Sequence, residues 1–130
     1  MSAAPLPAQY LCASHELAER GDGLRFEVLL WGQPQAAFAL RIDGRAVAYV
    51  NRCAHVPSQM DSPPGQFLTS DKRWIICSVH GAMYDPGSGY CIEGPCRGEQ
   101  LMPIAVQEQQ GAIHWWPTPD IEPVSSAFPE

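Results

Sequence analysis

Two short segments of this 130-residue chain each carry one cysteine and one histidine at close spacing. In the first, CAHVPSQMD, Cys53 and His55 lie two positions apart, and in the second, CSVHGAMYD, Cys77 and His80 lie three apart. A proline follows the first pair and a glycine follows the second, which predicts loops and not helices at both places. Thiolate and imidazole groups are soft to borderline ligands, so the two pairs together predict a site for zinc or for an iron–sulfur cluster.

The distribution of the ligands favours an iron–sulfur cluster over a zinc finger. A Cys2His2 zinc finger groups its cysteines in one pair and its histidines in another, the latter on a helix. Here each loop supplies one of each, as a two-iron cluster with unlike irons requires. In that arrangement Cys53 and Cys77 bind the inner iron, whereas His55 and His80 bind the outer iron at the exposed tip. A structural zinc module that binds a protein partner and a mononuclear catalytic site are the alternatives.

The joint pattern Cys-x-His, a loop, and Cys-x-x-His-Gly resembles the Rieske [2Fe–2S] family. Three further stretches extend the resemblance. HGAMYDPGSGYC, at positions 80–91, is similar to the family's second cluster loop and the hairpin that follows it. GPC, at 94–96, is similar to its third, proline-containing loop, and DGRAVAYVNRCAH is similar to the hairpin that leads into the first loop. The resemblance is strongest over residues 41–106.

The resemblance implies one [2Fe–2S] cluster per chain, with Cys53, His55, Cys77 and His80 as its ligands. Two ferric ions, two sulfides and two thiolates sum to zero charge, because neutral histidines add none. A cluster with four cysteines carries two more negative charges, so histidine ligation eases the addition of an electron and raises the reduction potential. Because imidazoles bound to ferric iron can lose protons, the potential is expected to fall at high pH.

The resemblance also implies the surroundings of the cluster. Gly81 would let the backbone approach it, Tyr84 corresponds to a tyrosine that can bond a cysteine sulfur, and Pro95 corresponds to a rigid lid. High-potential members carry an extra cysteine in each cluster loop and a serine that bonds a sulfide, whereas the second loop of this chain has Val79 and Ala82 there. Fewer donors to sulfur predict a potential at the low end of the Rieske range of about −150 to +300 mV.

The elements that must position these loops are predicted to be short strands. Glycine (11) and proline (13) are frequent, which favours turns over long helices. LRFEVLLWG (24–32) and WIIC (74–77) are apolar runs typical of strands. Hairpins are predicted at Asp43–Gly44, whose two residues favour positive φ, at PGSG (86–89) and at Gln110–Gly111.

Three other segments carry structural expectations of their own. SHELAER (14–20) predicts one or two helical turns, with an irregular loop as the alternative. The segment 56–76 is longer than expected for the family, and it is interpreted either as a partner-docking flap or as a solvated hairpin. The tail, 117–130, holds four prolines and predicts an extended, weakly ordered strap.

These features predict one domain over residues 1–130, of the all-β class. The resemblance implies a Rieske-type antiparallel β-sandwich as its base, built from strands at both chain ends. It also implies a small cluster-binding subdomain, inserted at about residues 50–98 and followed by the proline-rich tail.

Charge and cysteine content limit the partners and the compartment. A net charge of −6 and a pI of about 5.1 make nucleic acid and anionic membranes poor partners and favour a basic protein surface. No run approaches the roughly 18 apolar residues of a membrane span and no signal peptide is recognised, so the cytoplasm is expected. Thiols stay reduced there, so Cys91 and Cys96 are expected as free thiols, with a local disulfide as the alternative.

The function that the resemblance implies is one-electron transfer by a carrier or small subunit, and not catalysis by the chain itself. A reductase would supply the electron, and an oxygenase or another redox enzyme would accept it. The chain is too short to hold the second, catalytic iron domain of a ring-hydroxylating oxygenase large subunit. The runner-up function is the small Rieske-like subunit of an assimilatory nitrite reductase.

Overall fold

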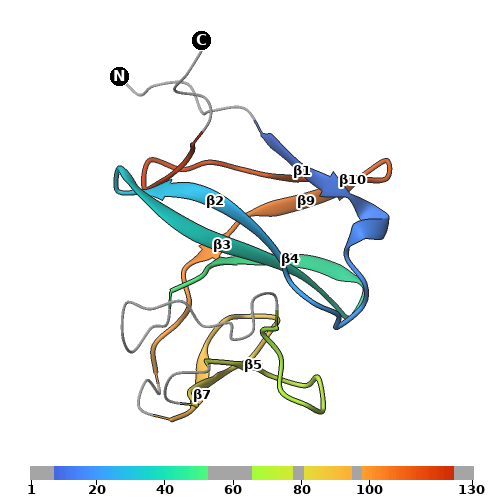
Figure 1. Ribbon diagram of the computed structural model, residues 1–130, viewed down its shortest axis with the longest axis vertical. Helices are drawn as coiled ribbons and strands as arrows, with labels where there is room; N and C mark the ends of the chain where they lie inside the picture. The colour runs from blue at the N-terminus through green and yellow to red at the C-terminus, as the bar shows by residue number, and fades with distance from the viewer. Residues whose placement is uncertain (1–7, 53–65, 78–80, 95–97, 125–130) are drawn as a thin grey trace.

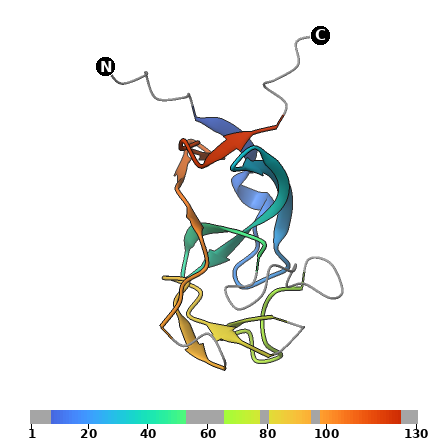
Figure 2. The ribbon, with the colours of Figure 1, turned by 90° about the vertical axis from the view of Figure 1, so that its left-hand side faces the viewer.

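The protein is built almost entirely from β-strands. The computed structural model describes residues 8–52, 66–77, 81–94 and 98–124. Within these ranges the strands form three antiparallel sheets, and the only helical element is one 3-10 turn, η1 (Ser14–Glu16). Two sheets stack in the upper part of Figure 1, and a third, smaller sheet lies beneath them in both views (Figure 1 and Figure 2). The all-β class predicted from the sequence is confirmed. No helix in the described ranges has the length and apolar character needed to cross a membrane.

The central sheet has five strands in the order β11-β2-β3-β4-β8. Trp31–Gly32 joins β2 to β3, and Asp43–Gly44 joins β3 to β4, with positive φ at every one of these residues. Two consecutive residues with positive φ form a type I′ turn, whose twist matches that of the flanking strands. The hairpin predicted at Asp43–Gly44 is therefore confirmed. The strands are β2 (Leu24–Leu30), β3 (Gln33–Ile42), β4 (Arg45–Val50), β8 (Pro103–Ile104) and β11 (Ile121–Pro123).

A sheet of three strands, in the order β1-β10-β9, completes the sandwich. Gln110–Gly111 joins β9 to β10, as predicted. Strand β1 pairs with β10 and β11 pairs with β2, so both ends of the chain contribute to the base, as expected. The expectation of a weakly ordered tail is wrong for residues 121–123, because main-chain pairing with β2 fixes them. The strands are β1 (Gln9–Ala13), β9 (Val106–Gln109) and β10 (Ala112–Trp115).

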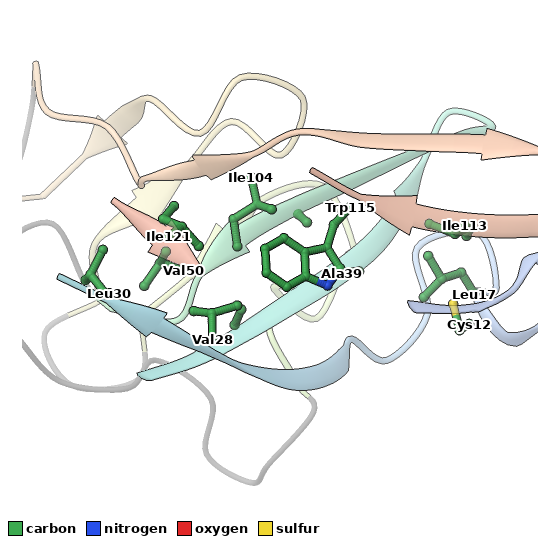
Figure 3. Packing of buried hydrophobic residues seen from close by; sticks show 12 residues of the cluster. Cys12, Leu17, Val28, Leu30, Ala39, Val50, Ile104, Ile113, Trp115 and Ile121 are labelled. Carbon is green, nitrogen blue, oxygen red and sulfur yellow. The ribbon is translucent and has the colours of Figure 1, made fainter. Parts of the chain in front are cut away.

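One face of the central sheet forms the core of the sandwich. Side chains alternate between the two faces of a strand, so Ala37 and Ala39 of β3 share this face with Ala48 and Val50 of β4. The small alanines leave room for the ring of Trp115, which is 4% exposed and lies beside Ala39 in Figure 3. The other buried members of this cluster are Cys12, Leu17, Val28, Leu30, Ile104, Ile113 and Ile121.

The opposite face of the central sheet forms a second core with the small sheet. Phe38, Leu40 and Ile42 of β3 point to this side together with Tyr49 of β4. The small sheet and its connections therefore share a core with the sandwich and do not form a separate appendage. The other buried members of this second core are Phe67, Ile75, Cys77, Ala82, Tyr84, Cys91 and Leu101.

The small sheet has the order β5-β6-β7. Its strands are β5 (Ile75–Ile76), β6 (Met83–Tyr84) and β7 (Cys91–Glu93). The turn predicted at 86–89 lies between β6 and β7, and β5 falls within the predicted strand 74–77. The solvated-hairpin interpretation of segment 56–76 is wrong for residues 66–76, because this described part forms a hairpin with two side chains in the second core.

The helix predicted over 14–20 is limited to the single turn η1. Beyond that turn, Leu17 is buried in the sandwich core and Glu19 forms a bridge pair with Arg41 of β3. The Arg41 guanidinium donates to the Leu17 carbonyl at 2.8 Å and to both carboxylate oxygens of Glu108 at 2.9 and 2.8 Å. These tertiary contacts outweigh the weak helical propensity of the segment.

Candidate metal centre

Cys77 is the one expected ligand that lies within the described residues. Cys53, His55 and His80 lie outside them, as does Pro95. Within the described ranges no group of three or more histidine, cysteine, aspartate or glutamate side chains could hold a metal ion. The assignment of the four ligands therefore rests on the sequence pattern together with the environment of Cys77.

Cys77 follows β5 directly, and its main chain is held on both sides of the second loop. Its N–H donates to the carbonyl of Ala82 at 2.8 Å, and the N–H of Gly81 donates to the carbonyl of Cys77 at 2.9 Å. The side chain is fully buried, and its sulfur is not in a disulfide. A buried thiol on a fixed backbone suits a thiolate ligand, because the chain need not reorganise to present it.

Gly81 has a φ of +74°, a conformation that favours glycine over residues with a Cβ. A Cβ built on Gly81 has no described atom within 4 Å. Its backbone conformation therefore explains the glycine, and the expected close approach to a cluster stays a prediction.

The surroundings of Cys77 are apolar and tightly packed. Ala82 and Tyr84 are both fully buried and belong to the same core as Cys77. Gly94, with a φ of +102°, begins the third loop so close to the second that a Cβ on it would lie 3.0 Å from the Ala82 Cα. The end of the second loop and the start of the third thus lie on adjacent backbone, which fits the lid role expected for Pro95.

Cys91 departs from its expected state. It is disulfide-bonded, whereas a free thiol was expected; Cys96 lies outside the described residues. Cys91 is 6% exposed in β7, so its sulfur is shielded from reductants that reach surface disulfides. The expectation of a free Cys91 is wrong because it weighed the redox state of the compartment and not the burial of this sulfur.

Asn51, two residues before Cys53, is a buried polar residue that the sequence reasoning missed. Its N–H donates to the Ala36 carbonyl at 2.8 Å, and its carbonyl accepts a hydrogen bond from Gln35 Nε2 at 3.2 Å. The end of β4 is thereby fixed at the point where the chain enters the first Cys–His loop. The available signal was a polar residue at the end of the apolar run AVAYV.

Tyr49 connects the central sheet to the hairpin that carries the second loop. Its hydroxyl donates to the Pro86 carbonyl at 2.8 Å, and its ring fills the space beside Gly89, where a Cβ would lie 2.7 Å from Tyr49 Cε1. Burial, and then the charge of Asp85, raises the pKa of Tyr49 to about 12. The hydroxyl therefore stays protonated and keeps its hydrogen bond at neutral pH.

Solved structures that share this fold include three from carbazole 1,9a-dioxygenase systems. The ferredoxin of carbazole 1,9a-dioxygenase from Nocardioides aromaticivorans IC177 matches with a TM-score of 0.66 and 18% identity, over 85% of this chain and 98% of that chain. A chain in a complex of reduced oxygenase and oxidized ferredoxin in carbazole 1,9a-dioxygenase matches with a TM-score of 0.63 and 19% identity, over 84% and 92%. A chain in the reduced complex between oxygenase and ferredoxin of carbazole 1,9a-dioxygenase matches with a TM-score of 0.68 and 22% identity. This match covers 84% of the present chain and 28% of that one, so the present chain spans under a third of its length.

The match to a family model agrees with the resemblance drawn from the two loops. No curated protein matches the chain. The family model for the Rieske [2Fe–2S] domain matches residues 8–118, which include both Cys–His pairs and the strands around them. The chain therefore belongs to the Rieske [2Fe–2S] domain family.

Proposed function

We propose that this protein passes single electrons between redox partners, with a [2Fe–2S] cluster held by Cys53, His55, Cys77 and His80. The observation that carries the proposal is the state of Cys77: a buried thiol, outside any disulfide, at the base of a loop closed by two main-chain hydrogen bonds. Family membership supplies the type of cluster. When bound, the cluster supplies one-electron redox chemistry.

The chain's own part is to hold the ligand loops still and to set their polarity. Asn51 fixes the entrance to the first loop, and Cys77 and Ala82 fix the two ends of the second. A rigid frame keeps the reorganisation that accompanies electron transfer small. Position 82 is a buried alanine, whereas high-potential members of the family are expected to have a serine there, whose hydroxyl donates to sulfur. The missing donor supports a reduction potential at the low end of the family range.

The partners that fit this role are a reductase as donor and an oxygenase or another redox enzyme as acceptor. Solved neighbours of the same fold include complexes of an oxygenase with a ferredoxin, which supports an acceptor of this kind. The net charge of −6 favours a basic docking surface on the partner. Cys12 and Cys77 lie outside any disulfide, which supports the cytoplasm as the compartment, whereas the disulfide of Cys91 counts against it unless the burial of Cys91 protects that bond from reductants.

The test is anaerobic purification followed by iron and sulfide analysis and electron paramagnetic resonance of the dithionite-reduced protein. We expect a red-brown protein with two irons per chain and a lower average g value than an all-cysteine cluster gives. His55→Ala and His80→Ala should lose iron. Cys12→Ser is the matched control, because Cys12 is a buried thiol of the sandwich core, and it should keep the cluster.

Two results would contradict the proposal. One is a colourless protein that contains zinc and no inorganic sulfide, which would favour the structural zinc module. The other is a full complement of iron in both histidine variants.

A further inference from the structure

Phe67 lies in the segment that separates the two Cys–His pairs, and its side chain is fully buried. Its ring stacks on the ring of Phe38 in β3, with centroids 3.9 Å apart and planes inclined by 12°. Phe38 also contacts Tyr49, with centroids 5.9 Å apart. The segment is thus anchored by an aromatic side chain to the central sheet of the base, and not only to the small sheet that it helps to build.

Gly23, just before β2, makes room for this anchor. A Cβ built on Gly23 would lie 2.5 Å from Cδ2 and 2.6 Å from Cε2 of Phe67, closer than real Cβ contacts come. Gly23 is not among the glycines with positive φ, so its backbone would accept alanine. The ring of Phe67, and not the backbone conformation, therefore explains a glycine at position 23.

The main chain of Phe67 leads directly to Cys77. The Phe67 carbonyl accepts a hydrogen bond from the N–H of Ile76 at 2.8 Å, and Leu68 forms a bridge pair with Ile75. Cys77 is the next residue, and its side chain lies in the same buried core as Phe67. A displacement of Phe67 must therefore pass to Ile76 and to the start of the second loop, because packed cores do not deform freely.

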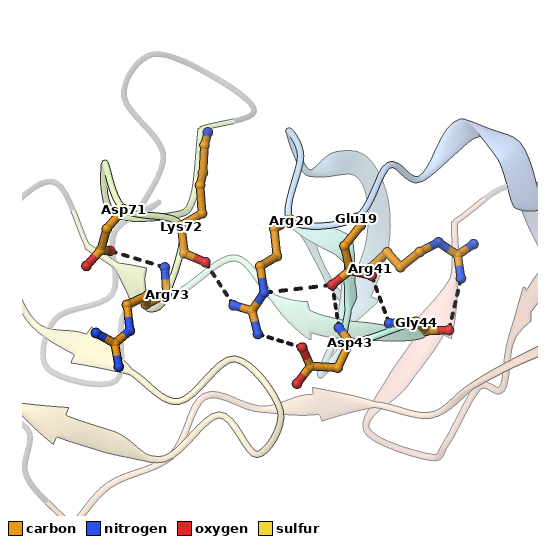
Figure 4. A network of polar contacts seen from close by, with 8 residues as sticks. All are labelled: Glu19, Arg20, Arg41, Asp43, Gly44, Asp71, Lys72 and Arg73. Atoms are coloured by element: carbon orange, nitrogen blue, oxygen red, sulfur yellow. Dashed lines mark hydrogen bonds and ion pairs between the residues drawn. The ribbon is translucent and has the colours of Figure 1, made fainter.

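The far end of the same hairpin is held by Arg20. Its guanidinium donates to the Lys72 carbonyl at 2.8 Å and to Asp43 Oδ1 at 2.9 Å, and Figure 4 places it between these two turns. Within the hairpin, the Thr69 N–H donates to the Trp74 carbonyl at 2.8 Å. With its tip held in this way, the hairpin cannot simply swing away from an obstruction at Phe67.

We propose that Phe67 is a positioning residue for Cys77, through which the base sets the geometry of that cysteine, and that Gly23 is required for it. The inference rests on the proposed function, in which Cys77 is a cluster ligand. Phe67 acts through the Ile76 main chain, so it sets the position of the Cys77 main chain and, with it, of the Cys77 sulfur. Donors to the sulfurs and their surroundings tune the potential of such a centre.

The test compares four variants of the holoprotein: Gly23→Ala, Phe67→Leu, the double variant, and Gly87→Ala. In Gly23→Ala the new methyl group displaces the Phe67 ring. Overpacking of this size changes the ratio of folded to unfolded protein by a factor of roughly 5 to 30. We expect shifted g values, a shifted midpoint potential and loss of the cluster to a chelator about fivefold faster or more. Phe67→Leu should shift the g values and the potential as well, because it removes the stacked ring. In the double variant the smaller leucine leaves room for the new methyl group, so adding Gly23→Ala to Phe67→Leu should change the three readouts much less than Gly23→Ala does alone.

Gly87→Ala is the matched control. A Cβ on Gly87 would meet only Asp85 Oδ1, at 3.6 Å, and Gly87 is not among the glycines with positive φ. This variant should keep the wild-type g values and potential.

A merely structural role predicts a different outcome. If Gly23→Ala lowers the melting temperature but leaves the g values and the potential unchanged, the proposal is wrong. Should Gly23→Ala fail to fold, Phe67→Leu decides, because wild-type g values and potential in that variant overturn the proposal. A wild-type protein without an iron–sulfur cluster would instead refute the proposed function on which the inference rests.

Discussion

Replacing Tyr49 by phenylalanine should destabilise the protein at neutral pH and remove part of its sensitivity to alkali. Tyr49 is 3% exposed, and its hydroxyl donates to the carbonyl of Pro86, which is itself buried. The substitution keeps the ring and removes only the donor, so the Pro86 carbonyl is left without this partner in an apolar place. A buried acceptor that loses its donor costs about 1–3 kcal/mol of the free energy of unfolding.

The alkaline part follows from the raised pKa of Tyr49. Burial first, and then the charge of Asp85, raises this pKa from 10.0 to about 12, because the folded state disfavours the phenolate. The stability that the protonated hydroxyl contributes is therefore fully present below pH 10 and is lost as the pH rises toward 12. Two pKa units correspond to at most about 3 kcal/mol.

Urea unfolding of the wild type and Tyr49→Phe in parallel, from about pH 8 to about pH 11, measures both effects, since the linear extrapolation gives the free energy at each pH. The wild type should be the more stable protein at pH 8, and the gap should narrow as the pH rises above about 10. Other groups titrate identically in both proteins and cancel in the difference. A gap that is absent at pH 8, or that stays constant up to pH 11, would refute the reasoning.

Three further predictions follow from described contacts. Arg41 lowers the pKa of Glu108 from 4.5 to about 2, so this pair stabilises the fold above pH 4.5 and less as the pH falls toward 2. Glu108→Gln should lower the free energy of unfolding by about 1–2 kcal/mol at pH 7, and this free energy, measured with urea at each pH, should then fall less steeply between pH 4.5 and pH 2. An unchanged slope in this pH range would argue against the pair. Gly89→Ala should lower the free energy of unfolding by more than about 2 kcal/mol, measured by thermal or urea unfolding. Gly89 has a φ of +82°, and a Cβ on it would lie 2.7 Å from Tyr49 Cε1. A mild effect would contradict this packing. Arg20→Ala should speed hydrogen exchange of the Thr69 amide about fivefold, because the hairpin tip loses the hydrogen bond from Arg20 to the Lys72 carbonyl. Arg45→Ala, at the exposed start of β4, is the control and should leave this exchange rate unchanged.

The sequence predicted the hairpins, and it revealed the two Cys–His pairs, because each of these features has a strong local cause. Asp43–Gly44 and Gln110–Gly111 form turns with positive φ, which favours glycine at the second position. The ligand pattern is equally local, since each pair spans a few residues. The family match over residues 8–118 confirmed the family that this pattern implied, and the four ligands stay a prediction.

The features that the sequence did not predict depend on contacts between distant segments. The segment 14–20 was predicted to form one or two helical turns; it forms one, and a second is absent because Arg41, from β3, donates to the carbonyls of Ser14 and Leu17. The tail 121–123 looks like a proline-rich strap, yet it pairs with β2. The state of Cys91 depends on its burial in β7, which composition and compartment do not reveal. For segment 14–20 and for the tail, a long-range contact outweighed a weak local preference.

The sequence of strand β3 contains a continuous apolar run, which does not reveal which side chains face which core. AAFALRI lacks the polar–apolar alternation of a strand with one wet face, and a continuous apolar run indicates burial on both faces. The structure resolves the run into two sets: small Ala37 and Ala39 face the sandwich, whereas larger Phe38 and Leu40 face the small sheet. Small residues admit the Trp115 ring on one side, and large residues receive the second core on the other. One strand therefore sets the spacing of the sandwich and supports the hairpin that ends at Cys77, so a substitution in β3 should alter both the stability of the base and the packing at the start of the second Cys–His loop.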